Sequence, residues 1–198
     1  AFTSQLLITT NETGSDKDAY ATIDGGTTNL IIGTSTIDGN LTLRSGGTIT
    51  DTDSSTVTVK GTLTATTDQL NKIITLNDLA VGGAFTLAPH GTGAVTIVNA
   101  AGLILATSTM GGTFSGTATN GHITQSGDLT ITGAATFITA TTSKNIILDQ
   151  NNEFTTTVTM KAGTGGSDAF NNITFVDTNG VDLVSSTPSA GDLFIDAS

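Results

Sequence analysis

Apolar and polar residues alternate in short runs along this chain. In the run "NLTLR", Leu41 and Leu43 alternate with Thr42 and Arg44, and "TVTVK", "TLTAT", "DLTIT", "TVTM" and "NITFV" are built in the same way. A period of two places successive side chains on opposite faces of a β-strand. Gly, Asn, Asp and Ser, which favour turns, separate the runs. The pattern therefore predicts an all-β protein made of many short strands.

One segment is ambiguous between helix and turn. "TDQLNKIITL", residues 67–76, has an Asp near its start, as a helix N-terminus often does. The related segment "TSKNIIL", residues 142–148, has no helical periodicity. We therefore expect residues 67–76 to form a turn that leads into a strand.

The sequence repeats itself. Residues 95–109, "VTIVNAAGLILATST", align without a gap on "ITFVDTNGVDLVSST", which begins 78 positions later. The offset grows to that value across "AGTGGSDAF", residues 162–170, where the Gly and Ser content predicts an inserted loop. At offsets of 72 or 73, four further pairs of segments match: 31–39 with 104–112, 57–66 with 129–138, 72–78 with 144–150, and 84–87 with 157–160.

These matches predict a repeating unit of about 75 residues. We divide the chain into a partial or N-terminal coil at residues 1–28, a first unit at 29–100 and a second unit at 101–198. All three would belong to one continuous solenoid.

A parallel β-solenoid explains both the short strands and the long repeat. Each coil would bury its inner face against its neighbours, with about twenty residues per coil and three to four coils per unit. The alternative is an antiparallel β-sandwich, whose hairpins often use Asp-Gly or Asn-Gly turns. Such dipeptides occur within residues 24–26, 38–40, 120–122 and 179–181. A sandwich, however, does not explain a repeat of this length.

Composition and charge exclude several classes of partner. The 198 residues carry a net charge of −11 with only six basic side chains, so nucleic acid is not an expected partner. No apolar run approaches the ~20 residues of a membrane-spanning helix. The absence of Cys excludes disulfides and Cys-based metal sites and is compatible with export. Because the chain begins at Ala1, we expect either a removed signal peptide or a fragment of a longer protein.

Candidate catalytic residues are few. His90 and His122 both lie in turn-like contexts, which favours surface positions over a catalytic pair. Asp51 and Asp53, and the acidic segment 12–20, could bind calcium or supply an acid and a base. We favour solvated turn carboxylates. No catalytic, cofactor-binding or metal-binding residue is therefore predicted, and no cofactor.

Rows of threonine raise a different function. Thr-x-Thr motifs such as those in "TVTV", "TLTAT" and "TFSGTAT" could order water and bind ice if they lay on one flat face. Their spacing in the sequence is irregular. We also expect Arg44 and Lys60 to interrupt the polar face, so ice binding is a minor alternative.

Three segments resemble the repeats of filamentous-haemagglutinin-like exoproteins, which are large bacterial surface proteins. They are "GNLTLRSGGTIT" (39–50), "GDLTITGAATF" (127–137) and "KNIILDQNNEFTTTVTM" (144–160), and the resemblance extends over residues 29–180. It implies a right-handed parallel β-helix, export from the cell and an adhesive or fibre-forming role.

These observations favour a structural, non-enzymatic segment located outside the cell or on its surface. We find no sequence signal for caps at the ends of the solenoid, and open strand edges associate readily. We therefore expect self-association, with further repeats or with other subunits, in an adhesin stalk, a fibre or a biofilm. The alternative is a carbohydrate-active enzyme or a glycan-binding module, with host or cell-surface glycans as partners.

Overall fold

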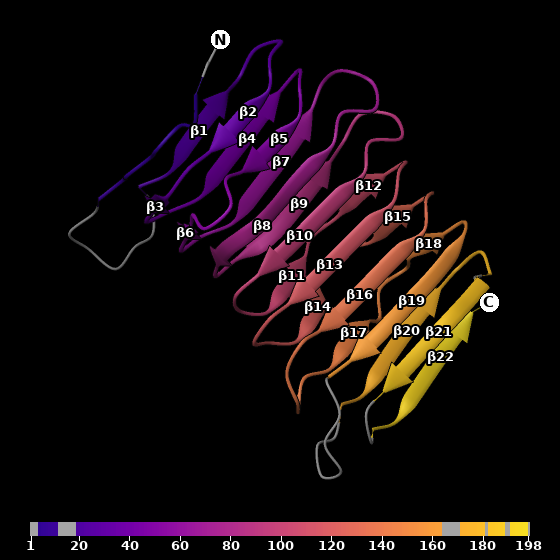
Figure 1. Cartoon of the computed structure of the whole chain (residues 1–198). Coiled ribbons are helices and arrows are strands. Elements are labelled where there is room, and N and C mark those ends of the chain that lie inside the picture. Colours follow the sequence, from indigo (N-terminus) through magenta and orange to yellow (C-terminus); the bar gives the residue numbers. More distant parts are fainter. Residues whose placement is uncertain (1–3, 12–18, 164–170, 181, 189–190, 198) are drawn as a thin grey trace.

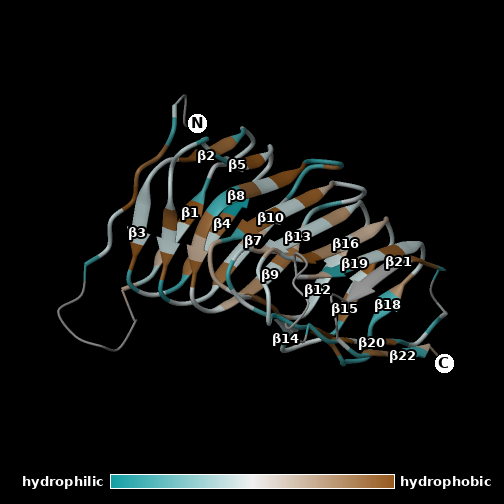
Figure 2. Ribbon diagram, turned by 60° about the horizontal axis from the view of Figure 1, so that its bottom comes forward, coloured by the Kyte–Doolittle hydropathy of each residue, from teal (hydrophilic) through white to brown (hydrophobic). Residues whose placement is uncertain are grey.

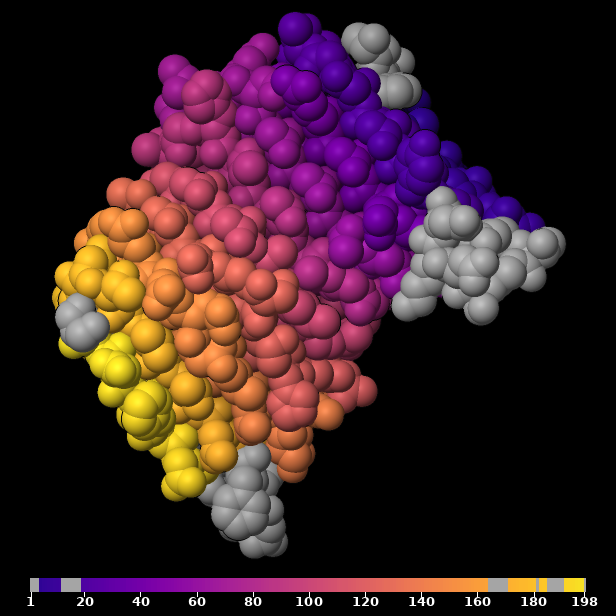
Figure 3. Space-filling view, turned by 180° about the vertical axis from the view of Figure 1, so that it is seen from behind, coloured from indigo at the N-terminus to yellow at the C-terminus, as the bar shows by residue number. Residues whose placement is uncertain are grey.

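The computed structural model describes residues 4–11, 19–163, 171–180, 182–188 and 191–197. Within these ranges the chain forms only strands and turns, without a helix, and every pair of neighbouring strands is parallel. The strands stack into a column with the N-terminal and C-terminal parts at opposite ends (Figure 1). From behind, the colours follow one another in bands along this column (Figure 3).

Two long sheets run the length of the column. Sheet A follows the path β2 (Leu30–Ile32), β5 (Ile49–Asp51), β8 (Ile74–Val81), β10 (Val95–Asn99), β13 (Phe114–Ala118), β16 (Ala135–Thr139), β19 (Thr157–Ala162) and β21 (Asp182–Pro188). Sheet B follows β1 (Ala21–Asp24), β4 (Leu41–Ser45), β7 (Leu63–Thr67), β9 (Ala84–Ala88), β11 (Leu103–Leu105), β14 (Ile123–Gln125), β17 (Ile146–Leu148), β20 (Ile173–Asp177) and β22 (Leu193–Ala197).

The chain alternates between the two sheets, and each circuit forms one coil. In sheet B, Ala21 pairs with Leu41, and Leu41 pairs with Leu63 in the next coil. About eight such coils make up the described column, which confirms the β-solenoid. The antiparallel sandwich is wrong, because the turns at 24–26 and 120–122 carry the chain to the other sheet rather than into a hairpin.

The predicted alternation is also confirmed. Leu41 and Leu43 are fully buried, whereas Arg44 is exposed. Hydrophobic positions recur from strand to strand along the column (Figure 2). The ambiguous segment is a turn: residues 69–71 connect β7 to the start of β8, and Asn71 has a positive φ of 62°.

Two short ladders add a third side to some coils. In the first half of the column, β3 (Ser35–Ile37) and β6 (Val57–Val59) pair in series with residues 79–81 of β8. In the second half, β12 (Ser108–Met110), β15 (Leu129–Ile131) and β18 (Glu153–Phe154) form sheet C. The first ladder follows strands of sheet A along the chain, and the second follows strands of sheet B.

This change of side follows from the length of the repeat. Residues one repeat apart lie on opposite long sheets: Leu63 of sheet B corresponds to Ala135 of sheet A, and Ile74 of sheet A to Ile146 of sheet B. From β7 the chain passes three strands of sheet B (β9, β11 and β14) and then crosses to β16. One unit is therefore three and a half coils, within the three to four predicted. Successive units are related by half a turn about the axis of the column.

The core contains aliphatic side chains and, in the second half, a row of phenylalanines from all three sheets. Phe137 of sheet A lies 6.0 Å from Phe154 of sheet C, between ring centroids, and Phe154 lies 5.3 Å from Phe175 of sheet B. Phe114 continues the row at 5.2 Å from Phe137. Such aromatic pairs are stabilising beyond the area that they bury.

The insertion predicted near residues 162–170 falls where one coil is long. Ile146 pairs with Ile173, 27 positions later, whereas Ile123 pairs with Ile146, 23 positions later. Residues 164–170 themselves lie outside the described residues.

Candidate functional surfaces

The candidate acids Asp51 and Asp53 do not form a joint site, and the expectation of solvated turn carboxylates is confirmed for Asp53 but wrong for Asp51. Asp51 is half-buried at the end of β5, where its carboxylate accepts hydrogen bonds from the backbone N–H groups of Asn77 (3.1 Å) and Asp78 (2.8 Å). Asp53 is exposed in the following turn, beside Ser54, which has a positive φ of 67°. Burial raises the pKa of Asp51, although the two backbone hydrogen bonds oppose this shift. Asp51 thus holds the middle of β8, where this strand passes from sheet A to the first short ladder, against the preceding coil.

The two histidines are both exposed and lie at different corners of the column. His90 follows β9, and its Nδ1 lies 2.6 Å from the backbone oxygen of Asp68. His122 precedes β14, and its Nδ1 accepts a hydrogen bond from the backbone N–H of Asn145 at 2.8 Å. Each ring therefore contacts the backbone of a neighbouring coil, and the structure does not bring the two together as a pair.

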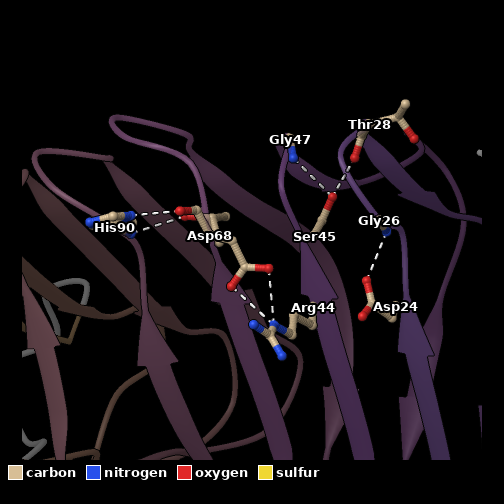
Figure 4. A network of polar contacts seen from close by, with 9 residues as sticks. Asp24, Gly26, Thr28, Arg44, Ser45, Gly47, Asp68 and His90 are labelled. Atoms are coloured by element: carbon tan, nitrogen blue, oxygen red, sulfur yellow. Dashed lines mark hydrogen bonds and ion pairs between the residues drawn. The ribbon is translucent and has the colours of Figure 1, made fainter.

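A polar network joins three coils at one corner of sheet B. The Arg44 side chain donates from Nε to both carboxylate oxygens of Asp68 at 3.0 Å, while the Asp68 backbone contacts His90 (Figure 4). The hydrogen bond to Asp68 raises the pKa of Arg44. Because both side chains are exposed, water and salt screen this ion pair, so it contributes little to stability.

No metal site is assembled in the part of the chain that the structure describes, where no three His, Cys, Asp or Glu side chains gather in a suitable cluster. The acidic segment 12–20, the other candidate for calcium, lies mostly outside the described residues, since only Ala19 and Tyr20 of it are described. The described residues also form no helix that is long and apolar enough to cross a membrane.

Asparagine side chains connect successive coils, a role that sequence analysis missed. In each case the side-chain oxygen accepts a hydrogen bond from a backbone N–H in the next coil. Asn145, for example, accepts from Asn172 at 2.9 Å, and Asn172 accepts from Asp192 at 2.9 Å. The same contact is made by Asn29, Asn40 and Asn71. In each contact the donor lies 19 to 27 positions after the asparagine, about one coil further on. Asn29, Asn40, Asn145 and Asn172 each stand directly before the first residue of a strand, which is the signal that could have identified them.

Two shallow hollows lie where the first short ladder ends. One, of about 280 Å³, has Leu79, Val98 and Ala100 in its lining, and the other, of about 310 Å³, has Val81, Ala100 and Asn120. They flank residues 79–81 of β8, which is the last member of the first ladder. The hollows therefore mark the junction between two units.

A row of hydroxyl side chains follows the outer face of sheet A, one residue per strand. Its members are paired in register from each strand to the next: Thr50, Thr75, Thr96, Ser115, Thr136 and Thr159. The two residues expected to interrupt the polar face do not lie on it, although another charged residue, Lys161, follows Thr159 in β19. Arg44 belongs to sheet B, and Lys60 follows β6 and pairs with Asp38 at 2.6 Å.

Both ends of the column present strand edges and partly exposed apolar side chains. At the C-terminal end, Leu193 and Ile195 pair with the buried Ile173 and Phe175, yet 45% and 38% of their surfaces are exposed. Phe194, between them, is 58% exposed. Leu193 and Ile195 are exposed because they occupy inward positions in the last described strand of sheet B, which has a neighbour on one side only.

A family model described as repeats of unknown function (DUF5649) matches the chain twice, at residues 18–88 and 92–161. The first match contains strands β1 to β9, and the second contains β10 to nearly all of β19. Each match is therefore one unit of three and a half coils. No curated protein and no solved structure matches the chain. Since the two matches together span more than half of the sequence, the chain belongs to this family of repeats of unknown function.

Proposed function

We propose that this chain is a structural segment rather than an enzyme, and that it extends by end-to-end stacking in an extracellular or cell-surface stalk or fibre. The single observation that carries the proposal is the state of the two ends. Among the described residues, β1 and β22 of sheet B and β21 of sheet A have a strand neighbour on one side only, and the inward-facing Ala21, Ile23, Leu193 and Ile195 are only partly buried or exposed.

The two ends are geometrically complementary. At the N-terminal end, a segment at residues 4–11 lies beside sheet A through bridges from Leu6 to Ile32 and from Thr9 to Thr36, and β1 is the first strand of sheet B. The last strands are β21 in sheet A and β22 in sheet B. A second copy could therefore add its 4–11 segment to β21 and its β1 to β22. Both sheets would continue as parallel sheets without rotation of the incoming copy.

The side chains at the N-terminal end fit the same arrangement. Ala21 and Ile23 point inward, since they pair with the buried Leu41 and Leu43, but they are only partly buried. Placed against Leu193 and Ile195 of another copy, they would complete a coil of the core. Burial of apolar surface at ~25 cal/mol per Å² would drive this contact.

The adhesive role and the surface location rest on the resemblance to filamentous-haemagglutinin-like exoproteins and on the acidic, Cys-free composition. Recognition of host or cell-surface glycans stays a prediction. Protease treatment of intact cells that make the protein tests the location: a surface protein is cleaved, and an internal one is protected.

Sedimentation velocity and negative-stain electron microscopy of the purified chain test the stacking. We expect particles that lengthen with protein concentration and with salt, because salt screens the repulsion between copies of net charge −11. Ile195→Lys should abolish lengthening by placing a charge in the new core. Thr64→Lys, on the outer face of β7, is the matched control and should leave it unchanged. Dispersed monomers of the unaltered chain at all concentrations would exclude the fibre.

A further inference from the structure

The hydroxyl row on sheet A forms a continuous surface feature. Thr50 pairs with Thr75, Thr75 with Thr96, and the row continues through Ser115 and Thr136 to Thr159. All six residues are partly exposed and follow a buried residue, and all but Thr50 also precede one. Because neighbouring strands lie ~4.8 Å apart, the hydroxyls recur at a nearly constant distance over five successive strand pairs.

The surroundings of this row carry few charges. Next to it along the strands, the outward positions are Asn77 in β8, Val98 in β10, Thr117 in β13 and Ile138 in β16. Two charged side chains border the row: Asp78, which follows Asn77 in β8, and the exposed Lys161, which follows Thr159 at the next outward position of β19. In sheet B, Asp24 and Arg44 occupy outward positions in β1 and β4.

The hydroxyls of the row are available to an external ligand. Among the described residues, none of the six is engaged in a side-chain hydrogen bond within the protein. Each hydroxyl can donate one hydrogen bond and accept two. It can therefore replace a water molecule of a lattice, which also both donates and accepts hydrogen bonds. Val98 and Ile138, at the outward positions next to Thr96 and Thr136, are partly exposed and add apolar surface to the same face.

We propose that the outer face of sheet A, centred on Thr96 and Ser115, binds the surface of ice. A ligand of this chemistry requires regularly spaced hydroxyls and methyls on a rigid and flat support, and oxygen rows in ice recur at a distance close to the spacing of β-strands. The six positions of the row carry no aromatic ring for stacking on a sugar and no charge, although single charges of opposite sign, Asp78 and Lys161, lie beside them. This function is independent of end-to-end stacking, since one copy carries the whole face.

The half-turn between units explains how the row arises. Thr50 and Thr75 come from the first unit, whereas Ser115, Thr136 and Thr159 come from different positions of the second unit. The strands that carry the second group correspond to β4, β7 and β9, which lie in sheet B. The row is therefore a property of the folded column and not of any single repeat.

Partition of the purified chain into slowly growing ice, together with thermal hysteresis, tests the proposal. We expect the unaltered chain to concentrate in the ice fraction and to give measurable hysteresis. Thr96→Lys should remove most of both signals. Thr64→Lys is the matched control, because Thr64 also lies in a threonine row, Thr42–Thr64–Thr86, but on sheet B. Circular dichroism of each variant reports whether the sheet structure is retained.

Several outcomes would overturn the proposal. Exclusion of the unaltered chain from ice would do so, as would equal losses from Thr96→Lys and Thr64→Lys, or binding that neither changes. Should Thr96→Lys fail to fold, Thr117→Lys provides a second substitution on the same face, with the same expected loss.

Discussion

Asn99 and Asp177 hold the same position in successive units, and the side chain of each closes the end of a short ladder. The Asn99 amide accepts a hydrogen bond from the backbone N–H of Val81 at 2.8 Å and donates to the Val81 oxygen at 3.0 Å. The Asp177 carboxylate accepts from the backbone N–H of Phe154 at 2.9 Å. Both residues are fully buried. A side chain thus replaces the next strand at each place where a ladder stops, which protects an edge that would otherwise be open.

Asn99→Ala should destabilise the fold. The substitution leaves the Val81 N–H and C=O groups without these partners, and Asn99 also donates to the Gly102 oxygen at 2.6 Å. Unsatisfied buried polar groups cost about 1–3 kcal/mol each, so we expect a loss of about 2–4 kcal/mol in the free energy of unfolding. Urea denaturation followed by circular dichroism measures it.

Asn120→Ala is the control for that experiment, because Asn120 lines the adjacent hollow but is exposed. Its free energy of unfolding should stay within about 0.5 kcal/mol of the unaltered chain. A loss of the same size from both substitutions would show that Asn99 does not cap the ladder.

Gly116→Val should also destabilise the chain, because an inward position of β13 has no room for a side chain. A Cβ atom at Gly116 would lie 2.7 Å from Cζ of Phe114 and 2.9 Å from Cδ2 of Leu103. Overpacking of a core costs about 1–3 kcal/mol. Thr117→Val, the outward neighbour on the same strand, should change the free energy of unfolding by less than about 0.5 kcal/mol. Equal stabilities of the two variants would contradict the packing described for Phe114.

Phe154→Ala should be among the most destabilising truncations. Phe154 is buried in sheet C and contacts both Phe137 of sheet A and Phe175 of sheet B. Removing a buried phenylalanine ring costs about 3–5 kcal/mol, since a cavity remains. Phe194→Ala, at the exposed C-terminal end, removes the same ring from a position with little burial and should have little effect on the midpoint of urea unfolding. A similar midpoint for the two variants would show that the three sheets do not share one core.

Much of this fold could be predicted from the sequence, because its strands depend on local alternation. The alternation of Leu41 and Leu43 with Thr42 and Arg44 identifies a strand and its buried face without knowledge of any distant residue. The offset between repeats gave the number of coils per unit as three to four. The offset could not show that a unit contains an extra half coil. The sheet that a strand joins depends on the lengths of all the corners that precede it.

The surfaces were less predictable for the same reason. Arg44 and Thr96 lie in similar Thr-rich runs, yet they belong to opposite sheets. A charged residue in a Thr-rich run therefore interrupts a given face only if its strand belongs to that sheet. The sheet is set by the number of half coils that precede the strand. The capping role of Asn99 was equally hidden, since it depends on the absence of a ladder strand after β10 and not on any local motif.

Asp51 should make stability depend on pH in a direction opposite to that of a salt-bridged carboxylate. Burial raises the pKa of Asp51 in the folded chain above its ordinary value of 3.8, and the nearby Asp78 adds to this shift. The folded state then binds the proton more tightly than the unfolded state does. The contribution of this group to stability is therefore greatest at low pH, and it falls as the pH rises from 3.8 through the raised pKa.

Comparison of the unaltered chain with Asp51→Asn isolates this effect, because the other carboxylates are common to both proteins. Asn does not titrate, so the free energy of unfolding of the unaltered chain minus that of the variant should fall across this pH window and then become constant. Urea unfolding of both proteins, from below the ordinary carboxyl range to neutral pH, measures the difference. A difference that rises with pH would mean that the hydrogen bonds from Asn77 and Asp78 outweigh burial, and that Asp51 is stabilised as the carboxylate.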